Sequence, residues 1–185
     1  MNTNLMRVVD LWVGAPLCFV ATGLDRLLRR FRKRPAPATP PHRILFIQLA
    51  ETGGIVVACP AVARAKALFP GAEIFFLSFT LGDGILQIIG VDRDHRVTIR
   101  TDGLVRFALD SLRAVLALRR LGIDAIVNLE TFARYSTLLA WAVAAPRRVG
   151  FHRFHDEGHY VGALLTHRVI YNPHVHAGRT FLALV

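Results

Sequence analysis

Cysteine, acidic residues and long apolar runs are scarce in this chain of 185 residues. Its two cysteines, Cys18 and Cys59, stand in unlike contexts, which argues against a disulfide framework and fits a reducing compartment. Only 13 acidic residues oppose 23 Lys and Arg, so the formal net charge is +10. That excess suits an anionic partner, which can be nucleic acid, anionic lipid or a phosphorylated substrate.

Several catalytic and nucleotide-binding motifs are also missing. The sequence contains no GxGxxG or Walker loop, which bind dinucleotides and nucleotide phosphates, and no GxSxG elbow of a serine hydrolase. It also lacks the HExxH zinc motif, paired cysteines and internal repeats. These absences argue against the corresponding hydrolase and zinc-enzyme classes, and the remaining polar residues must carry any chemistry.

Residues 1–34 combine an apolar stretch with a dense basic cluster. The stretch "LWVGAPLCFVATGL", residues 11–24, is shorter than the about 20 apolar residues that a spanning helix needs. Six basic residues follow within positions 26–34. We expect this segment to lie on anionic lipid, peripherally, at the inner face of the cytoplasmic membrane. An ordinary helix packed on its own domain, or a subunit contact, is the open alternative.

A Pro-rich linker over residues 35–42 precedes a predicted domain over residues 43–185. In that domain apolar strands such as "RILFIQL", "EIFFLSF" and "IDAIVNLE" alternate with helical runs such as "IVVACPAVARAKALF" and "GLVRFALDSLRAVLALRRLG". Alternation of this kind is typical of right-handed βαβ units. The sequence therefore predicts an α/β, Rossmann-like fold with a mostly parallel sheet and helices on both faces.

Polar residues follow three of the predicted strands. In parallel sheets, ligands bind beyond the carboxyl ends of the strands. We therefore expect one crevice formed by residues from three loops: Glu51, Thr52, Gly53 and Gly54 after the first strand, Glu130, Thr131 and Arg134 after "IDAIVNLE", and His152, Arg153 and His155 after "RRVGF".

The turn "ETGG", residues 51–54, has two open interpretations. Its glycines permit a tight bend and the close approach of a phosphate or sugar, but turn geometry alone also explains them. A carboxylate at the crevice mouth, Glu51 or Glu130, is a candidate general base whose pKa a second carboxylate would raise. An ion pair with Arg134 or Arg153 explains the same carboxylates equally well.

The histidines raise the question of a metal site. Six of the eight fall between positions 152 and 176, and "HRFHDEGHY" offers a His-x2-His spacing beside two acids. Structural zinc sites usually add cysteine or a second firmly spaced pair, which is missing here. We therefore predict no metal, and we assign this loop to the wall of the expected crevice, where His and Arg can hydrogen-bond hydroxyls and phosphates.

The stretch "RILFIQLAETGGIVVACPAVARAKALFPGAEIFFLSF" resembles the N-terminal signature of glycosyltransferase family 9, the heptosyltransferase-like enzymes. "IDAIVNLETFARYSTLLAWAVAAPRRVGF" resembles a later segment of the same family, so the resemblance covers roughly residues 43–185. It implies a GT-B fold of two Rossmann-like domains, the N-terminal one for the acceptor and the C-terminal one for the nucleotide sugar. It also implies inverting transfer to a lipopolysaccharide or glycolipid acceptor, without a metal or other cofactor.

Two departures from the family pattern change what the resemblance implies. Gly54 stands where the family has a turn Asp that resembles a catalytic base, and Glu51 on the same loop is the candidate replacement. The nucleotide-sugar domain is absent from this sequence, so we expect the chain alone to bind acceptor without catalysing transfer. The alternative is a non-catalytic, membrane-associated binding module. Nucleic acid is disfavoured, because the densest basic run adjoins an apolar segment and is not interleaved with aromatics over a face.

Overall fold

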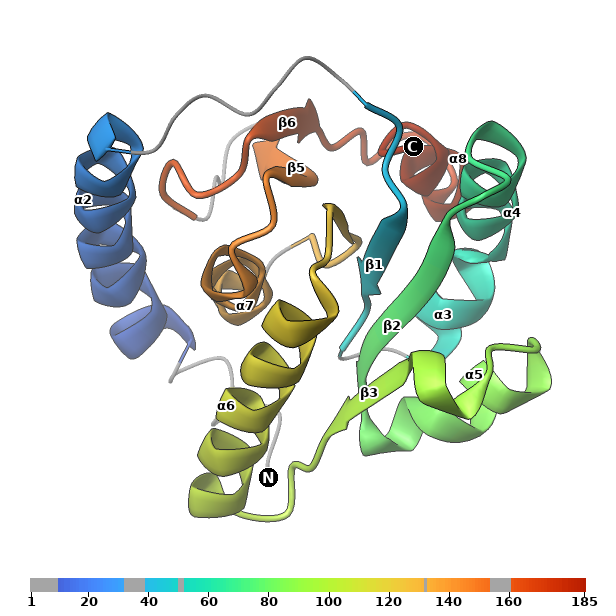
Figure 1. The fold of residues 1–185 in the computed structure, drawn as a ribbon, viewed down its shortest axis with the longest axis horizontal. Coiled ribbons are helices and arrows are strands. Elements are labelled where there is room, and N and C mark those ends of the chain that lie inside the picture. The colour runs from blue at the N-terminus through green and yellow to red at the C-terminus, as the bar shows by residue number, and fades with distance from the viewer. Residues whose placement is uncertain (1–9, 32–38, 50–51, 132, 154–160) are drawn as a thin grey trace.

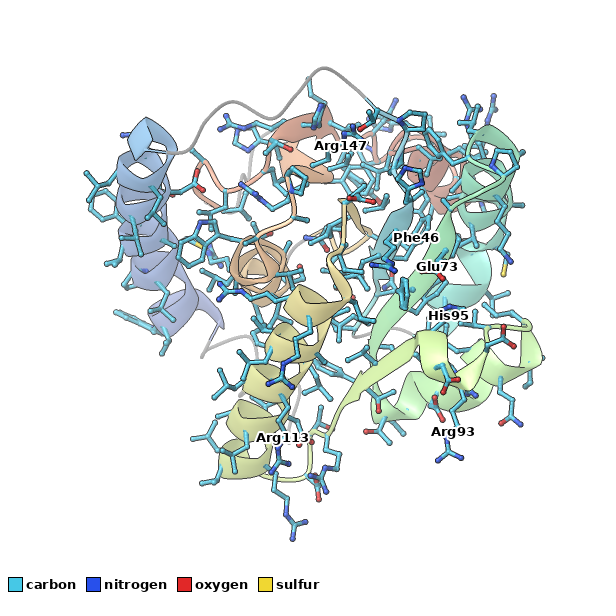
Figure 2. All side chains as sticks on the ribbon, viewed as in Figure 1. Phe46, Glu73, Arg93, His95, Arg113 and Arg147 are labelled. Atoms are coloured by element: carbon cyan, nitrogen blue, oxygen red, sulfur yellow. The ribbon has the colours of Figure 1, made fainter. Side chains whose placement is uncertain are left out.

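The structure is a computed structural model that describes residues 10–31, 39–49, 52–131, 133–153 and 161–185. In its central strands, apolar side chains alternate between the two faces of the sheet. In β1 (Arg43–Ile47), Ile44 and Phe46 face one side of the sheet while Leu45 and Ile47 face the other. All four are buried, because helices cover both faces. Phe46 lies at the centre of the molecule, stacked on Phe76 with ring centroids 5.5 Å apart (Figure 2).

The sheet has six strands in the order β3-β2-β1-β4-β5-β6, and every neighbouring pair is parallel. The other five strands are β2 (Glu73–Phe79), β3 (Arg96–Ile99), β4 (Ala125–Asn128), β5 (Arg147–Arg153) and β6 (His167–Ile170). The predicted α/β, Rossmann-like class is thereby confirmed. The chain crosses from β3 to the far side of β1, so the connections diverge between β1 and β4. The carboxyl ends of these two strands are the place where such sheets form a ligand-binding crevice.

Helices form a layer on each face of the sheet (Figure 1). One layer contains α3 (Thr52–Val57), α4 (Cys59–Leu68), α5 (Asp83–Ile88) and α8 (Ala177–Leu182), and the other contains α6 (Leu104–Leu121) and α7 (Arg134–Val143). Short 3₁₀ turns span Thr80–Gly82 and Arg93–His95. Phe76 and Phe181 belong to the core of the first layer, and Leu77, Leu118 and Leu139 to that of the second.

The helical run after β1 is divided where the sequence predicts one helix. α3 ends at Val57 and α4 begins at Cys59, with Pro60 in the first turn of α4. Proline has no N–H for a bond to the carbonyl four residues earlier, and its ring occupies that space. The division shortens α3 to six residues.

The N-terminal segment packs on the domain through α2 (Ala15–Phe31), which follows a π-helical turn at Asp10–Gly14. Cys18 and Ala21 are buried against α7 and Leu164. Asp25 also lies inside this contact, where its Oδ1 accepts a hydrogen bond of 3.1 Å from Trp141 Nε1. The opposite side of α2 is exposed, and Phe19 is 71% accessible. Within the described residues, no helix has the length and apolar character needed to cross a membrane.

Candidate functional site

The loops after β1 and β4 meet at the carboxylate of Glu130. Its Oε1 accepts a hydrogen bond of 2.6 Å from the backbone N–H of Leu49 and one of 3.1 Å from Gln48 Nε2. Gln48 directly follows β1, and Glu130 lies two residues beyond β4. Parallel strands bring these segments to one edge of the sheet. Glu130 therefore joins the two predicted loops, although they are about 80 residues apart in sequence.

Asn128 shapes the loop between β4 and α7. Its Nδ2 donates to Ser136 Oγ at 3.0 Å and to Thr137 Oγ1 at 3.4 Å, and its Oδ1 accepts from the N–H of Glu130 at 3.2 Å. Asn128, Ser136 and Thr137 are all buried. These bonds fix the start of α7, whose first residue, Arg134, is a charged side chain only 5% exposed.

Gly54 lies directly beneath the amide of Gln48. A Cβ at this position would come within 2.7 Å of Gln48 Nε2 and 2.9 Å of its Cδ, closer than real contacts allow, whereas a Cβ at Gly53 would meet open space. Gln48 is 4% exposed, and its Oε1 is buried without a hydrogen-bond partner. The space that an aspartate side chain at position 54 would enter is thus already filled by glutamine.

The structure describes only some of the other predicted site residues. Glu51 and His155 lie outside the described residues. Thr52 is the first residue of α3, and Arg153 is the last of β5. His152, beside Arg153, has its Nε2 3.5 Å from Arg168 Nη1 on the neighbouring strand β6. β5 runs parallel to β4 with Gly150 opposite Asn128, so His152, near the end of β5, lies at the same edge of the sheet as Glu130.

The structure adds Gln48, Asn128, Ser136 and Thr137 to the residues predicted from the sequence. Gln48 and Asn128 had a signal in the sequence, since each is a polar residue at the end of an otherwise apolar strand, "RILFIQ" and "AIVN". No three His, Cys, Asp or Glu side chains among the described residues are placed to share a metal ion. The histidine loop over residues 154–160 falls outside that search.

Two ionisable side chains on α6 and α7 have strongly shifted pKa values. Arg100 Nε and Nη2 donate to Asp110 at 2.7 and 3.0 Å, and this pair lowers the pKa of Asp110 to about 2. Burial raises the pKa of Tyr135 to about 12, although its hydroxyl lies 2.6 Å from Ser111 Oγ, a hydrogen bond that lowers it. At neutral pH Asp110 is therefore an anion and Tyr135 is neutral, so neither acts as a base of neutral pKa.

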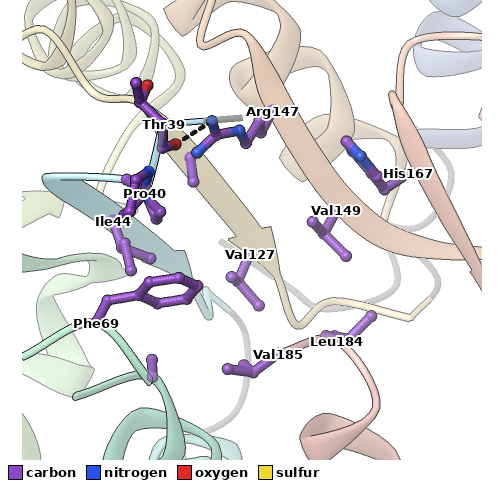
Figure 3. A pocket seen from close by; sticks show the side chains of 13 residues that line it. Thr39, Pro40, Ile44, Phe69, Val127, Arg147, Val149, His167, Leu184 and Val185 are labelled. Atoms are coloured by element: carbon purple, nitrogen blue, oxygen red, sulfur yellow. Dashed lines mark hydrogen bonds between the residues drawn. The ribbon is translucent and has the colours of Figure 1, made fainter. Parts of the chain in front are cut away.

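A separate hollow of about 370 Å³ lies at the opposite edge of the sheet (Figure 3). Its wall is apolar and includes Ile44, Phe69, Val149 and Leu184. At its rim the Arg147 guanidinium donates to the carbonyl of Thr39. Ile44 and Arg147 belong to the amino ends of their strands, so this hollow does not adjoin the loops joined by Glu130.

Solved structures share this fold. The heptosyltransferase WaaC of E. coli with ADP-2-deoxy-2-fluoro heptose matches with a TM-score of 0.64 at 15% identity, over 77% of this chain and 46% of that one. The same enzyme with ADP matches with a TM-score of 0.61 at 13% identity, over the same shares. A family 9 glycosyl transferase of Veillonella parvula gives 0.61 at 16% identity, over 77% of this chain and 40% of that one.

No protein-family model and no curated protein matches the sequence. The chain spans less than half the length of each of these solved proteins. The structural likeness covers about three quarters of this chain, and it agrees with the resemblance in sequence. This chain therefore has the Rossmann-like fold found in heptosyltransferases and other family 9 glycosyltransferases.

Proposed function

We propose that this chain is the acceptor-binding half of an inverting, heptosyltransferase-like glycosyltransferase that transfers sugar from a nucleotide-sugar donor to a lipopolysaccharide or glycolipid acceptor. The observation that supports it most is the junction at Glu130, which unites the loops after β1 and β4. This is the position at which open α/β sheets bind ligands. The sheet has the fold of proteins solved with ADP and with an ADP-heptose analogue.

The acceptor role is favoured over the donor role by the turn after β1. That turn carries "ETGG", which has neither the GxGxxG nor the Walker spacing that cradles a diphosphate. The nucleotide sugar then belongs to a second Rossmann-like half of the enzyme. Arg134, His152 and Arg153 supply donors for acceptor hydroxyls and phosphates, and Thr52, Gly53 and Gly54 supply the close backbone approach.

The transfer step requires a base at the acceptor hydroxyl. The hydroxyl oxygen bonds to the anomeric carbon, the bond from that carbon to the nucleoside diphosphate breaks, and the base takes the hydroxyl proton. We assign the base to Glu51, because the Gln48 amide fills the space beside Gly54. Glu130 holds the loop and lines the site, since its Oε1 is already bonded to Gln48 and Leu49.

A membrane surface is the proposed location of the acceptor. The exposed side of α2 is apolar, and six basic residues lie within positions 26–34. An apolar helix face followed in sequence by a basic cluster suits the interface of an anionic bilayer. We therefore place the protein peripherally, at the inner face of the cytoplasmic membrane, with α2 in contact with lipid.

A non-catalytic binding module is the second candidate, favoured by one observation. Gly54 replaces the turn Asp of the family, and the Gln48 amide covers the position. Such a module shares the acceptor site and the membrane surface with the proposed enzyme half. The two functions differ only in whether turnover occurs and whether it depends on Glu51.

A transfer assay separates these functions. ADP-heptose and a lipopolysaccharide-core acceptor are incubated with this chain alone, and with this chain joined to the nucleotide-sugar half of a family 9 enzyme. We expect no product from the chain alone and product from the joined protein. Transfer by the chain alone would contradict the assignment as an acceptor half. Acceptor binding without transfer in the joined protein would favour the non-catalytic module.

A further inference from the structure

Large apolar side chains are concentrated on the surface of two helices. α2 and the turn before it expose Trp12 at 75% and Phe19 at 71%. α6 exposes Val105 at 73% and Leu112 at 57%. Exposed apolar patches of this kind mark surfaces that bind protein or lipid.

The exposed apolar residues of α6 form one continuous stripe. Val105, Leu109, Leu112 and Leu116 are spaced i, i+4, i+7 and i+11, which places them on one face of an α-helix. The buried residues of α6 include Ala114 and Leu118, which lie on the opposite face and pack on the sheet. The apolar stripe of α6 is therefore a second apolar face that the core does not use.

A row of arginines runs along one side of this stripe. Arg106, Arg113 and Arg120 repeat every seven residues and are all exposed. Arg106 reaches Asp102 at 2.7 Å and Arg113 reaches Asp110 at 3.5 Å, yet their side chains remain 64% and 71% exposed. Figure 2 shows Arg113 extending outward from α6. An apolar face edged by cations is the pattern of helices that lie in the interface of anionic membranes.

We propose that α6 is a second membrane-contacting helix, whose stripe enters the interface of the same anionic bilayer as α2. This inference rests on the membrane location proposed above. Both helices contact α7 and lie on the same side of the sheet (Figure 1). A hydrogen bond from Trp141 of α7 to Asp25 and the packing of Cys18 and Ala21 attach α2 to α7. Two helices in contact with one surface fix the orientation of the protein, whereas a single helix leaves rotation about its own axis free.

The orientation matters for the site because α7 begins at Arg134, beside the crevice. A fixed tilt holds that edge of the sheet at a constant height above the headgroups, where a glycolipid presents its sugars. A second copy of the chain is a less favoured occupant of the stripe, since each copy carries a formal charge of +10 and the arginine rows add to the repulsion. Anionic lipid neutralises the same charges.

Flotation with phosphatidylglycerol-containing vesicles tests the inference. The variant Leu109→Gln/Leu112→Gln removes apolar surface without changing charge. The matched control Ala108→Gln/Ala117→Gln places the same side chains on exposed positions outside the stripe. We expect the stripe variant to bind at least about tenfold more weakly than the parent, because two leucine side chains are no longer transferred from water into the bilayer. The control should bind like the parent. Circular dichroism confirms that both variants are folded.

Three results would overturn the proposal. If the stripe variant binds vesicles as strongly as its control, α6 does not contact the membrane. A concentration-dependent dimer that the stripe substitutions dissociate assigns the stripe to a second copy. If the parent protein does not bind anionic vesicles, neither α2 nor α6 contacts a membrane. The variant Phe19→Gln/Val20→Gln tests α2 in the same assay, so loss of binding there with no effect in α6 leaves the membrane location standing and contradicts only the role of α6.

Discussion

Replacement of Glu51 by glutamine should lower sugar transfer by at least about tenfold while leaving the fold intact. A positioned general base accelerates proton removal by roughly a hundred- to ten-thousand-fold, and glutamine keeps the size of the side chain but cannot accept the proton. The rate is measured in the joined protein, with ADP-heptose and the acceptor both at saturation, so that turnover and not acceptor affinity is compared. The unfolding midpoint in urea checks that the fold is retained.

Glu73→Gln is the matched control for this substitution. Glu73 begins β2 at the opposite edge of the sheet, where its Oε2 lies 2.9 Å from Arg43 Nε and both side chains are about half exposed. Surface pairs of this kind contribute little, so turnover should be unchanged. Near-normal turnover in Glu51→Gln would remove this carboxylate from the mechanism. Such a result would leave the non-catalytic module as the better proposal.

Position 54 explains why the base is expected at Glu51. In the family pattern the acid stands where this chain has Gly54, and here the Gln48 amide lies 2.7 Å from the site of a new Cβ. Gln48 is held in turn by Glu130. An acid at position 54 would have to displace a buried, hydrogen-bonded side chain, whereas an acid at position 51 precedes α3 on the same loop.

Arg148→Met should lower the free energy of unfolding by about 3–5 kcal/mol, because it removes one partner of a buried ion pair. Arg148 Nη2 lies 3.6 Å from Asp25 Oδ1, and the two side chains are 5% and 8% exposed. Its Nε also donates to the carbonyl of Leu164 at 2.8 Å, and its Nη1 to that of Ala145 at 2.6 Å. Urea denaturation measures the change.

Two further variants separate the ion pair from nonspecific damage. Arg120→Met alters an exposed arginine and should change stability by less than about 0.5 kcal/mol. Arg148→Met/Asp25→Asn also removes the buried carboxylate charge but keeps an acceptor for Trp141, so part of the lost stability should return. A loss below about 1 kcal/mol in Arg148→Met would show that this pair does not hold α2 on the domain.

The strands and helices were readable from the sequence because their signals are local. Runs such as "RILFI" are apolar at nearly every position, as a strand covered on both faces requires. The break between α3 and α4 was not predicted, although Pro60 was its local signal. The parallel sheet followed from alternation alone. The meeting of the loops after β1 and β4 followed from the rule on strand ends.

Partners far apart in sequence were not predicted. Asp25 and Arg148 carry no pattern that pairs them, and neither do Gln48 and Glu130. Residue spacing also fails to distinguish the buried apolar face of α6 from its exposed apolar stripe, because a helix that is apolar all round is expected to be buried. Only three-dimensional packing shows which face the core leaves exposed.

Acceptor binding mapped by amide chemical shifts tests the central claim most directly. An isotope-labelled sample of this chain is titrated with a soluble lipopolysaccharide-core oligosaccharide, without lipid. We expect the largest shift changes at Leu49, Gly53 and Gly54 and over residues 130–134. Changes confined to the hollow around Ile44 and Arg147, or no changes at saturating oligosaccharide, would contradict an acceptor site between β1 and β4.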